Sequence, residues 1–180
     1  MKKSINKTEQ IKSIINSAPD GTLFIASDFK LIENSENILD LLNNTFLTLD
    51  ELLDMDNDRR NMLLDNTDQC FQLIRVGIPL ERLLEIEYET SSHLIDKIDE
   101  VTALLEAGLS FDELMSSRNI CFSFMENSEN VIRLFRSGIT FQQLNQMTLE
   151  QRKQFLNASK EIESFIKAGI TPVDLCGISF

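Results

Sequence analysis

The chain has 180 residues, and its 29 acidic residues against 17 basic ones give a net charge of −12. This charge disfavours binding to nucleic acid and to anionic membrane surfaces. No apolar run approaches the ~18 residues that a membrane-spanning helix needs, and three widely spaced cysteines indicate a reducing compartment without a disulfide framework.

The N-terminal part of the chain differs in pattern from the remainder. We expect residues 1–7 to be frayed and residues 8–17 to form a helix with isoleucines on one side. Pro, Asp and Gly at 19–21 predict a turn, and residues 22–27 predict a short helix or an extended piece. The chain starts without the apolar segment of a secretory signal peptide, which indicates a protein that folds in a cytoplasm.

Glycines divide the rest of the chain at regular intervals. They stand 31, 30 and 31 residues apart, at Gly77, Gly108, Gly138 and Gly169. Each is predicted to end a helix in the left-handed conformation, which glycine adopts without steric cost. The aliphatic residue after the glycine then contacts the last turn of that helix, as Ile139 would contact Leu134. Residues 177–180, Gly-Ile-Ser-Phe, match the start of another repeat, and the sequence stops there.

A helix start comes after each glycine turn beyond Gly77. A Ser or Thr precedes an acidic or amide residue by three positions, in the pairs Ser110–Glu113, Thr140–Gln143 and Thr171–Asp174. These pairs are capping boxes or, for the Asp, a shorter relative. Thr148 and Gln151 form a further possible box in the middle of one repeat. We therefore predict three short helices per repeat; the alternative is two longer helices with an irregular join.

A five-residue motif marks the start of another helix in the repeat. Glu-Asn-Ser-Glu-Asn occupies residues 33–37 and recurs 93 residues later at 126–130. Asn and Ser before an apolar helical pattern indicate an N-cap, with the first such helix at 35–44. The next turn lacks a glycine and carries Asn43 and Asn44 with one extra residue, and there we expect Asn to adopt the left-handed conformation.

These patterns predict an all-α fold, an α-solenoid of about five tandem helical repeats of 30–31 residues. We expect a single helical-repeat domain over residues 1–180. Its parts are an N-terminal cap at 1–30, repeats at 31–168 and a partial C-terminal repeat at 169–180. At its end the chain is either cut or closed naturally by an apolar tail.

Few residues suggest chemistry. Cys70, Cys121, Cys176 and His93 offer a thiol nucleophile and a base, but Cys70 shares a core position with Val101, Val131 and Ile162, where cysteine acts as a small hydrophobe. The acidic cluster Asp50, Glu51, Asp54, Asp56 and Asp58 lacks the glycine-containing loop of a calcium site and suits helix starts instead. Met55, Ile86 and Met147 share a position that indicates core filling. We therefore expect no catalytic, cofactor-binding or metal-binding residue, and no cofactor.

The repeat opening resembles two known groups of proteins. Residues 104–114, Leu-Leu-Glu-Ala-Gly-Leu-Ser-Phe-Asp-Glu-Leu, are similar to the repeat opening of the mitochondrial transcription terminator (mTERF) family. That resemblance implies a curved solenoid that holds nucleic acid, although the mid-repeat proline is missing and the net charge is negative. The composition also resembles that of the α-helical-repeat effectors that intracellular bacterial pathogens inject into host cells. That resemblance implies secretion by a route independent of a signal peptide.

The expected function is that of a protein–protein interaction module, as a translocated bacterial effector or an adaptor, and not of an enzyme. The expected partner is another protein with a basic surface, with no binding to nucleic acid or membrane. Asp112, Gln142 and Gln143 are the expected contact positions. The first alternative is a nucleic-acid-binding protein of the transcription-terminator type, which would need Lys and Arg gathered on one face; the available residues, Arg75, Arg82, Arg133 and Arg136, are few. The second alternative is an enzyme without a recognisable motif.

Overall fold

The computed structural model describes residues 34–176, of which 76% are helical, with no strand among them. The all-α class is therefore confirmed for this part of the chain. Within this range, no helix combines the length and the apolar character that a membrane crossing requires. The expectations for residues 1–33, including the helix at 8–17, and for residues 177–180 lie outside the described residues.

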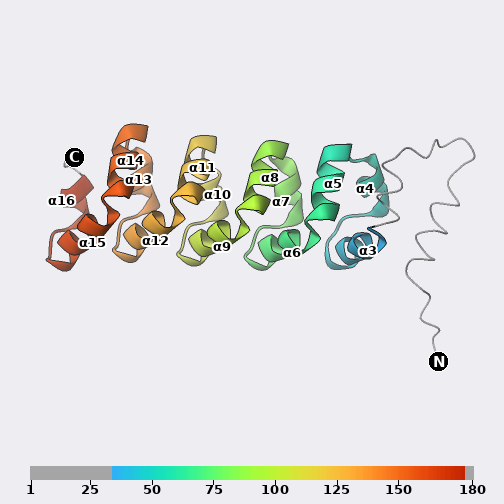
Figure 1. Cartoon of the computed structure of the whole chain (residues 1–180), viewed down its shortest axis with the longest axis horizontal. Coiled ribbons are helices and arrows are strands. Elements are labelled where there is room, and N and C mark those ends of the chain that lie inside the picture. Colours follow the sequence, from blue (N-terminus) through green and yellow to red (C-terminus); the bar gives the residue numbers. More distant parts are fainter. Residues whose placement is uncertain (1–33, 177–180) are drawn as a thin grey trace, which may run out of the picture. The chain divides into compact units, whose positions relative to one another are not determined.

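The helices are short and are joined to one another by turns of a few residues (Figure 1). Their bounds are α3 (Ser35–Asn44), α4 (Leu49–Asp54), α5 (Asn57–Asp65), α6 (Thr67–Arg75), α7 (Leu80–Glu85), α8 (Tyr88–Asp96), α9 (Ile98–Glu106), α10 (Phe111–Leu114), α11 (Arg118–Glu126), α12 (Ser128–Arg136), α13 (Phe141–Gln146), α14 (Leu149–Asn157), α15 (Ser159–Lys167) and α16 (Pro172–Cys176).

Helix lengths recur along the described chain. Helices α4, α7 and α13 have 6 residues and α10 has 4. Each of them is followed by two helices of 9 residues, such as α5 and α6 or α14 and α15. Three short helices therefore lie in each interval between helix-ending turns, as the capping pattern predicts, and the alternative of two longer helices is wrong.

The glycines end helices in the predicted way. Their φ angles are positive, from 94° at Gly138 to 102° at Gly108. The N–H of Ile139 donates to the carbonyl oxygen of Leu134 at 3.0 Å, and the N–H of Gly138 donates to that of Phe135 at 2.9 Å. This pair of bonds is a Schellman ending, and the same pair forms at the other three glycines. The predicted helix endings are therefore confirmed.

The predicted capping boxes also form. In each, the N-cap hydroxyl accepts the N–H of the residue three positions later, and that residue's side chain accepts the N-cap N–H. The pairs are Ser110–Glu113, Thr140–Gln143, Thr148–Gln151 and, with longer bonds of 3.3 and 3.4 Å, Thr171–Asp174. These local bonds begin the next helix directly after the turn that ended the previous one.

The turn between α3 and α4 differs from the expectation. No described residue other than glycine has a positive φ, so neither Asn43 nor Asn44 adopts the left-handed conformation, and that prediction is wrong. Instead α3 continues through Asn44, and Thr45 makes the turn. The N–H and hydroxyl of Thr45 both donate to the carbonyl of Leu41, at 2.9 and 2.7 Å. Its Oγ1 also accepts the N–H of Leu47 at 3.1 Å, so one side chain replaces the left-handed residue.

The asparagines expected as N-caps of the third helices act elsewhere. Asn127 precedes α12 without a side-chain capping bond, and its amide donates backward to the carbonyl of Ser123 at 2.9 Å. Asn66 donates to Met62 in the same way at 2.9 Å. A capping side chain needs extended backbone at its own residue, whereas Asn127 has φ −120° and ψ 29°. The capping explanation of the Glu-Asn-Ser-Glu-Asn motif is therefore wrong at this residue.

The chain divides into two compact units, and the boundary between them passes through α6 and α8. The first unit contains the residues up to Gln72 together with Pro79–Ser92. Its helices bury aliphatic side chains completely or nearly so, among them Ile38, Leu41, Leu52, Leu63, Leu64 and Leu83.

The second unit contains Leu73–Ile78 and the residues from His93 onward. Here α12 packs against α9 and α15, and α11 packs against α9. The fourth residue of each of these 9-residue third helices is fully buried: Val101 in α9, Val131 in α12 and Ile162 in α15. The apolar stripe of each helix is therefore used for packing against its neighbours.

Candidate functional site

The described cysteines occupy the core. Cys70 and Cys121 are both fully buried, and Cys70 takes the predicted position equivalent to Val131. Burial raises the pKa of Cys70 to about 12 and that of Cys121 to about 11. Because the thiolate is the reactive form, both thiols are poor nucleophiles at neutral pH. The side chain of Cys176 lies outside the described residues.

His93 packs against an aromatic side chain. Its ring lies edge-on to the ring of Phe122, with centroids 4.5 Å apart, and Arg118 lies 5.3 Å from the Phe122 centroid on that ring's face. The Nε2 atom of His93 is buried and has no hydrogen-bond partner among the described residues. The thiol of Cys121 instead lies 3.8 Å from the sulfur of Met115. This arrangement does not resemble a paired nucleophile and base.

The acidic cluster near residue 50 serves helix starts. Glu51 accepts the N–H and the hydroxyl of Thr48, both at 2.8 Å, in a capping box at the start of α4. Asp56 caps α5 by accepting the N–H of Arg59 at 2.9 Å. Among the described residues, no group of acidic, histidine or cysteine side chains has the arrangement of a metal site. The position of these carboxylates is thus explained by helix capping.

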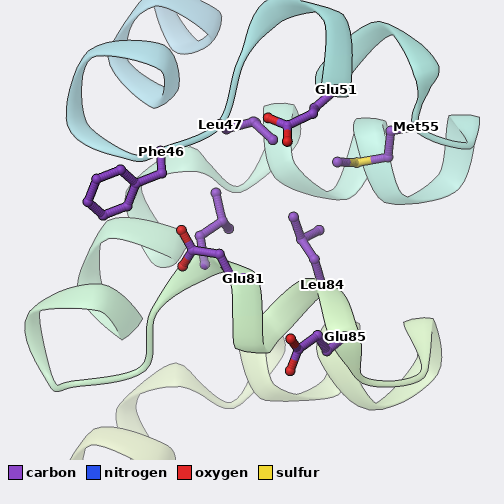
Figure 2. Close-up of a pocket in the computed structure, with 8 residues that line it drawn as sticks. Phe46, Leu47, Glu51, Met55, Glu81, Leu84 and Glu85 are labelled. Atoms are coloured by element: carbon purple, nitrogen blue, oxygen red, sulfur yellow. The ribbon is translucent and has the colours of Figure 1, made fainter.

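The best candidate for a binding site is a groove between α4 and α7 in the first unit. It has a volume of about 390 Å³ (Figure 2). Leu47, Glu51 and Met55 face it from the side of α4 and Leu84 does so from α7 (Figure 2), and Glu81 and Glu85 of α7 also line it. The groove thus has an apolar floor and carboxylates at its edges.

Phe46 stands at one end of this groove and is 92% exposed (Figure 2). It lies two residues before the N-cap Thr48, as Gly138 lies two residues before the N-cap Thr140. Because Thr45 makes the turn, the position before Leu47 has no need for glycine and carries a large aromatic side chain. An aromatic residue in solvent next to an apolar groove is typical of a contact surface.

The charge of the groove is negative. Glu51, Glu81 and Glu85 line it, and no basic residue does. The N–H of Thr48 holds the pKa of Glu51 below its usual value, so this carboxylate stays ionised at neutral pH. Arg59 donates to the carbonyls of Leu84 and Ile86 at the end of α7.

Arg59 does not neutralise the carboxylates of the groove, because it is paired with a different carboxylate. Its Nε lies 3.5 Å from Asp56, so its charge is partly balanced outside the groove.

Met55, together with Ile86 and Met147, is predicted from the sequence to fill the core. All three are only half-buried, and that prediction is wrong for Met55, which lines the groove.

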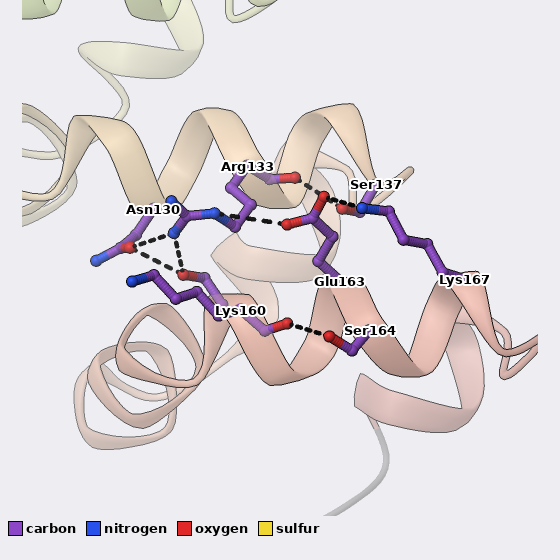
Figure 3. A network of polar contacts seen from close by, with 8 residues as sticks. Asn130, Arg133, Ser137, Lys160, Glu163, Ser164 and Lys167 are labelled. Carbon is purple, nitrogen blue, oxygen red and sulfur yellow. Dashed lines mark hydrogen bonds and ion pairs between the residues drawn. The ribbon is translucent and has the colours of Figure 1, made fainter.

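A second pocket, of about 350 Å³, lies between α12 and α15 and is lined by Arg133, Arg136, Glu129 and Glu163 among others. Arg133 lies 3.6 Å from Glu163 and donates to Ser159 at 3.0 Å (Figure 3). Glu163 is also paired with Lys167, which lowers its pKa. Arg133 is therefore engaged with Glu163 and Ser159, which leaves it poorly suited to phosphate binding.

The last asparagine of the repeated motif joins neighbouring helices. Asn130 in α12 accepts the hydroxyl of Ser159 in α15 at 2.8 Å (Figure 3). At the matching position in the first copy, Asn37 in α3 donates to the carbonyl of Leu64 in α5 at 2.8 Å. The motif therefore contributes to packing through contacts that its sequence did not reveal.

The expected contact positions on the short helices are only partly available. Asp112 and Gln142 are exposed. Gln143 is half-buried, and its Oε1 accepts the N–H of Thr140 at 2.8 Å, so it belongs to the cap. The groove residues were missed as a site because α4 and α7 lie far apart in sequence, beginning at Leu49 and Leu80. The absent glycine before Leu47 was the only local signal.

Comparison with protein-family models, with curated proteins and with solved structures finds no match for this chain.

Proposed function

We propose that this chain is an α-solenoid of about five helical repeats that binds another protein and performs no catalysis of its own. The groove between α4 and α7 carries this proposal, because it combines an apolar floor with carboxylates at its edges. Stacked repeats present extended surfaces for partners. The buried, protonated thiols of Cys70 and Cys121 give no support to a reaction at cysteine.

The partner we propose has a basic surface. The chain carries a net charge of −12, and such a field speeds the encounter with a positive partner and repels a negative one. The association rate should therefore fall as ionic strength rises, since ions screen exposed charges beyond about 10 Å at 0.1 M salt.

The test is a quantitative capture experiment with the full chain as bait. Proteins recovered at about 50 mM salt are purified, and their affinities for the chain are measured by interferometry across a salt series. We expect at least one basic protein with a saturable affinity that weakens as salt is raised. Recovery of acidic and basic proteins alike, or of none that binds when purified, would contradict the proposal.

The nucleic-acid alternative predicts tight binding of DNA or RNA, which we do not expect. Clustered cations are needed to release counterions from phosphates, yet Arg133 is engaged with Glu163. We expect no sub-micromolar binding of duplex or single-stranded DNA or RNA at about 150 mM salt, measured by fluorescence anisotropy.

The role as an injected bacterial effector depends on resemblance in composition alone and stays a prediction.

A further inference from the structure

We infer that the groove between α4 and α7 is the docking site for a basic amphipathic helix of a partner protein. This inference depends on the proposed function and adds the place of binding and the chemistry of the bound segment. Three properties of the groove lead to it: its apolar floor, its walls of helices rather than a strand edge, and the arrangement of its carboxylates.

The floor supplies a surface for apolar anchors. Leu47, Met55 and Leu84 are each half-buried, so part of each side chain remains for a partner to cover. Phe46 adds a ring that is 92% exposed at one end. Methionine adapts its shape to different partners, and a groove of about 390 Å³ is large enough for a few apolar side chains.

The backbone of the groove favours a helix as its ligand. An extended peptide binds well where a sheet edge offers unpaired N–H and C=O groups. Here the walls are the helices α4 and α7, which offer no strand edge, and the carbonyls of Leu84 and Ile86 at the end of α7 already accept from Arg59. The bound segment must therefore satisfy its own backbone, as an α-helix does, and present anchors at positions i, i+3 or i+4, and i+7.

The carboxylates specify basic residues beside those anchors. Glu81 and Glu85 are four positions apart in α7 and so lie on one face of that helix. Glu51 faces the groove from α4. Lysines or arginines on both sides of the apolar stripe of a bound helix would meet these charges, whereas a helix flanked by acidic residues would be repelled.

The probe is a synthetic 18-residue helical peptide that carries leucines on one face and lysines on the rest, labelled with a fluorophore. One control peptide has glutamate in place of every lysine, and another has serine in place of every leucine. Binding to the full chain is followed by anisotropy at about 50 and about 300 mM salt. We expect saturable one-to-one binding of the lysine–leucine peptide, at least about tenfold weaker binding of both controls, and weakening in higher salt.

Variants of the chain locate the site. Phe46→Ser removes the exposed ring, and the double variant Glu81→Gln/Glu85→Gln removes two charges. Their matched controls are Leu149→Ser, at an apolar residue that is 48% exposed in the other unit, and Glu106→Gln/Glu126→Gln, at exposed glutamates there. All four changes are at exposed positions, and circular dichroism checks that the variants remain folded. We expect each groove variant to lower affinity by about fivefold or more and each control by less than about twofold.

The outcomes separate this inference from the proposed function. If the peptide binds but the groove variants behave as their controls do, the docking site is elsewhere and only this inference fails. If neither the peptide nor any purified partner binds the wild-type chain, both fail. Light scattering of the free chain tests another occupant: a dimer that Phe46→Ser dissociates would assign the groove to a second copy of this chain and overturn the inference.

Discussion

Arg152 in α14 donates from Nε to the carbonyl oxygen of Leu144 at 3.0 Å, and from Nη2 to that of Met147 at 3.1 Å. These carbonyls lie near the end of the short helix α13, where the helical hydrogen bonds run out, although that of Leu144 also accepts the N–H of Met147 at 3.3 Å. Arg152 is only 6% exposed, so its guanidinium acts inside the protein as a C-terminal cap for the preceding helix. Burial lowers its pKa.

The residue at the same position in two other helices has the same role. Arg60 is the fourth residue of α5 and donates to Leu53 at 3.1 Å, and Ser91 is the fourth residue of α8 and donates to Leu83 at 2.7 Å. Both are buried. A buried polar residue at this position thus satisfies a carbonyl at the end of the short helix before it.

We expect Arg152→Met to lower the free energy of unfolding by about 2 kcal/mol. Methionine keeps much of the apolar stem, but it removes two hydrogen bonds and leaves two carbonyl oxygens without these donors. Urea unfolding followed by circular dichroism measures the change. Lys153→Met, at the exposed neighbouring residue, should alter stability by less than about 0.5 kcal/mol. Equal effects of the two substitutions would show that the cap has no energetic role.

Gly108→Val tests the helix-ending turns. Gly108 has φ 102°, and a Cβ added there meets no atom within 4 Å. The cost is therefore conformational rather than steric with neighbours, and we expect a loss of about 1–3 kcal/mol. Gly108→Asn should lose clearly less, since asparagine tolerates the left-handed region better. If valine and asparagine have the same effect on urea unfolding, backbone strain is not the reason for glycine at this position.

Leu134→Ala should lower the free energy of unfolding by about 2–5 kcal/mol, because Leu134 is fully buried and its removal leaves a cavity. Phe165 holds the equivalent position in α15 and forms the same bond with the residue after its glycine, but it is 42% exposed. Phe165→Ala should therefore lose less stability despite the larger side chain. A greater loss at Phe165 would contradict this account of the core.

Burial of the Cys70 thiol should make the protein less stable at alkaline pH. Its pKa is raised from 9.0 to about 12 by burial in the folded chain. Between these values the unfolded chain releases the thiol proton while the folded chain retains it, so stability is complete below pH 9 and falls as pH rises towards 12. The slope for one thiol is about 1.4 kcal/mol per pH unit at most.

Cys70→Val isolates this effect, because valine fills the same position in α9 and α12 at Val101 and Val131. We expect the unfolding free energy of the wild type to fall relative to that of Cys70→Val as the pH is raised from 8 to 10.5. Other groups titrate equally in both proteins. A difference that stays constant with pH would mean that the Cys70 thiol is not protonated by burial in this range.

The sequence predicts helix ends well because the interactions that make them are local. The bond between Ile139 and Leu134 and the capping box of Thr140 and Gln143 join residues at most five positions apart. Each requires a particular residue type, glycine for positive φ or a hydroxyl for the N-cap, so the pattern can be identified without knowledge of tertiary structure.

The groove and the links between helices could not be predicted in this way. Asn37 meets Leu64 across 27 residues, and Glu51 and Glu81 come together only because α4 and α7 lie next to one another. The failure at Asn127 has a physical cause of the same kind. The Asn127 side chain could either cap α12, which follows it, or bond to the carbonyl of Ser123 in α11, which precedes it. The backbone conformation at Asn127 favours the bond to Ser123.

His93→Phe should increase stability by about 1 kcal/mol. Nε2 of His93 is buried without a partner among the described residues, and such an atom costs about 1–3 kcal/mol. Phenylalanine keeps a ring for the edge-on contact with Phe122 at 4.5 Å and removes the polar atom. Its larger ring offsets part of the gain. Urea unfolding followed by circular dichroism measures the change.

His93→Asn is the matched variant, because asparagine keeps a polar group and loses the ring. It should lower stability through the lost contact with Phe122. If His93→Phe instead lowers stability as much as His93→Asn does, Nε2 must make a favourable bond, to water or to a ligand. In that case the imidazole has a use beyond packing, and His93 returns as a candidate for chemistry even though the thiol of Cys121 is protonated and directed at Met115.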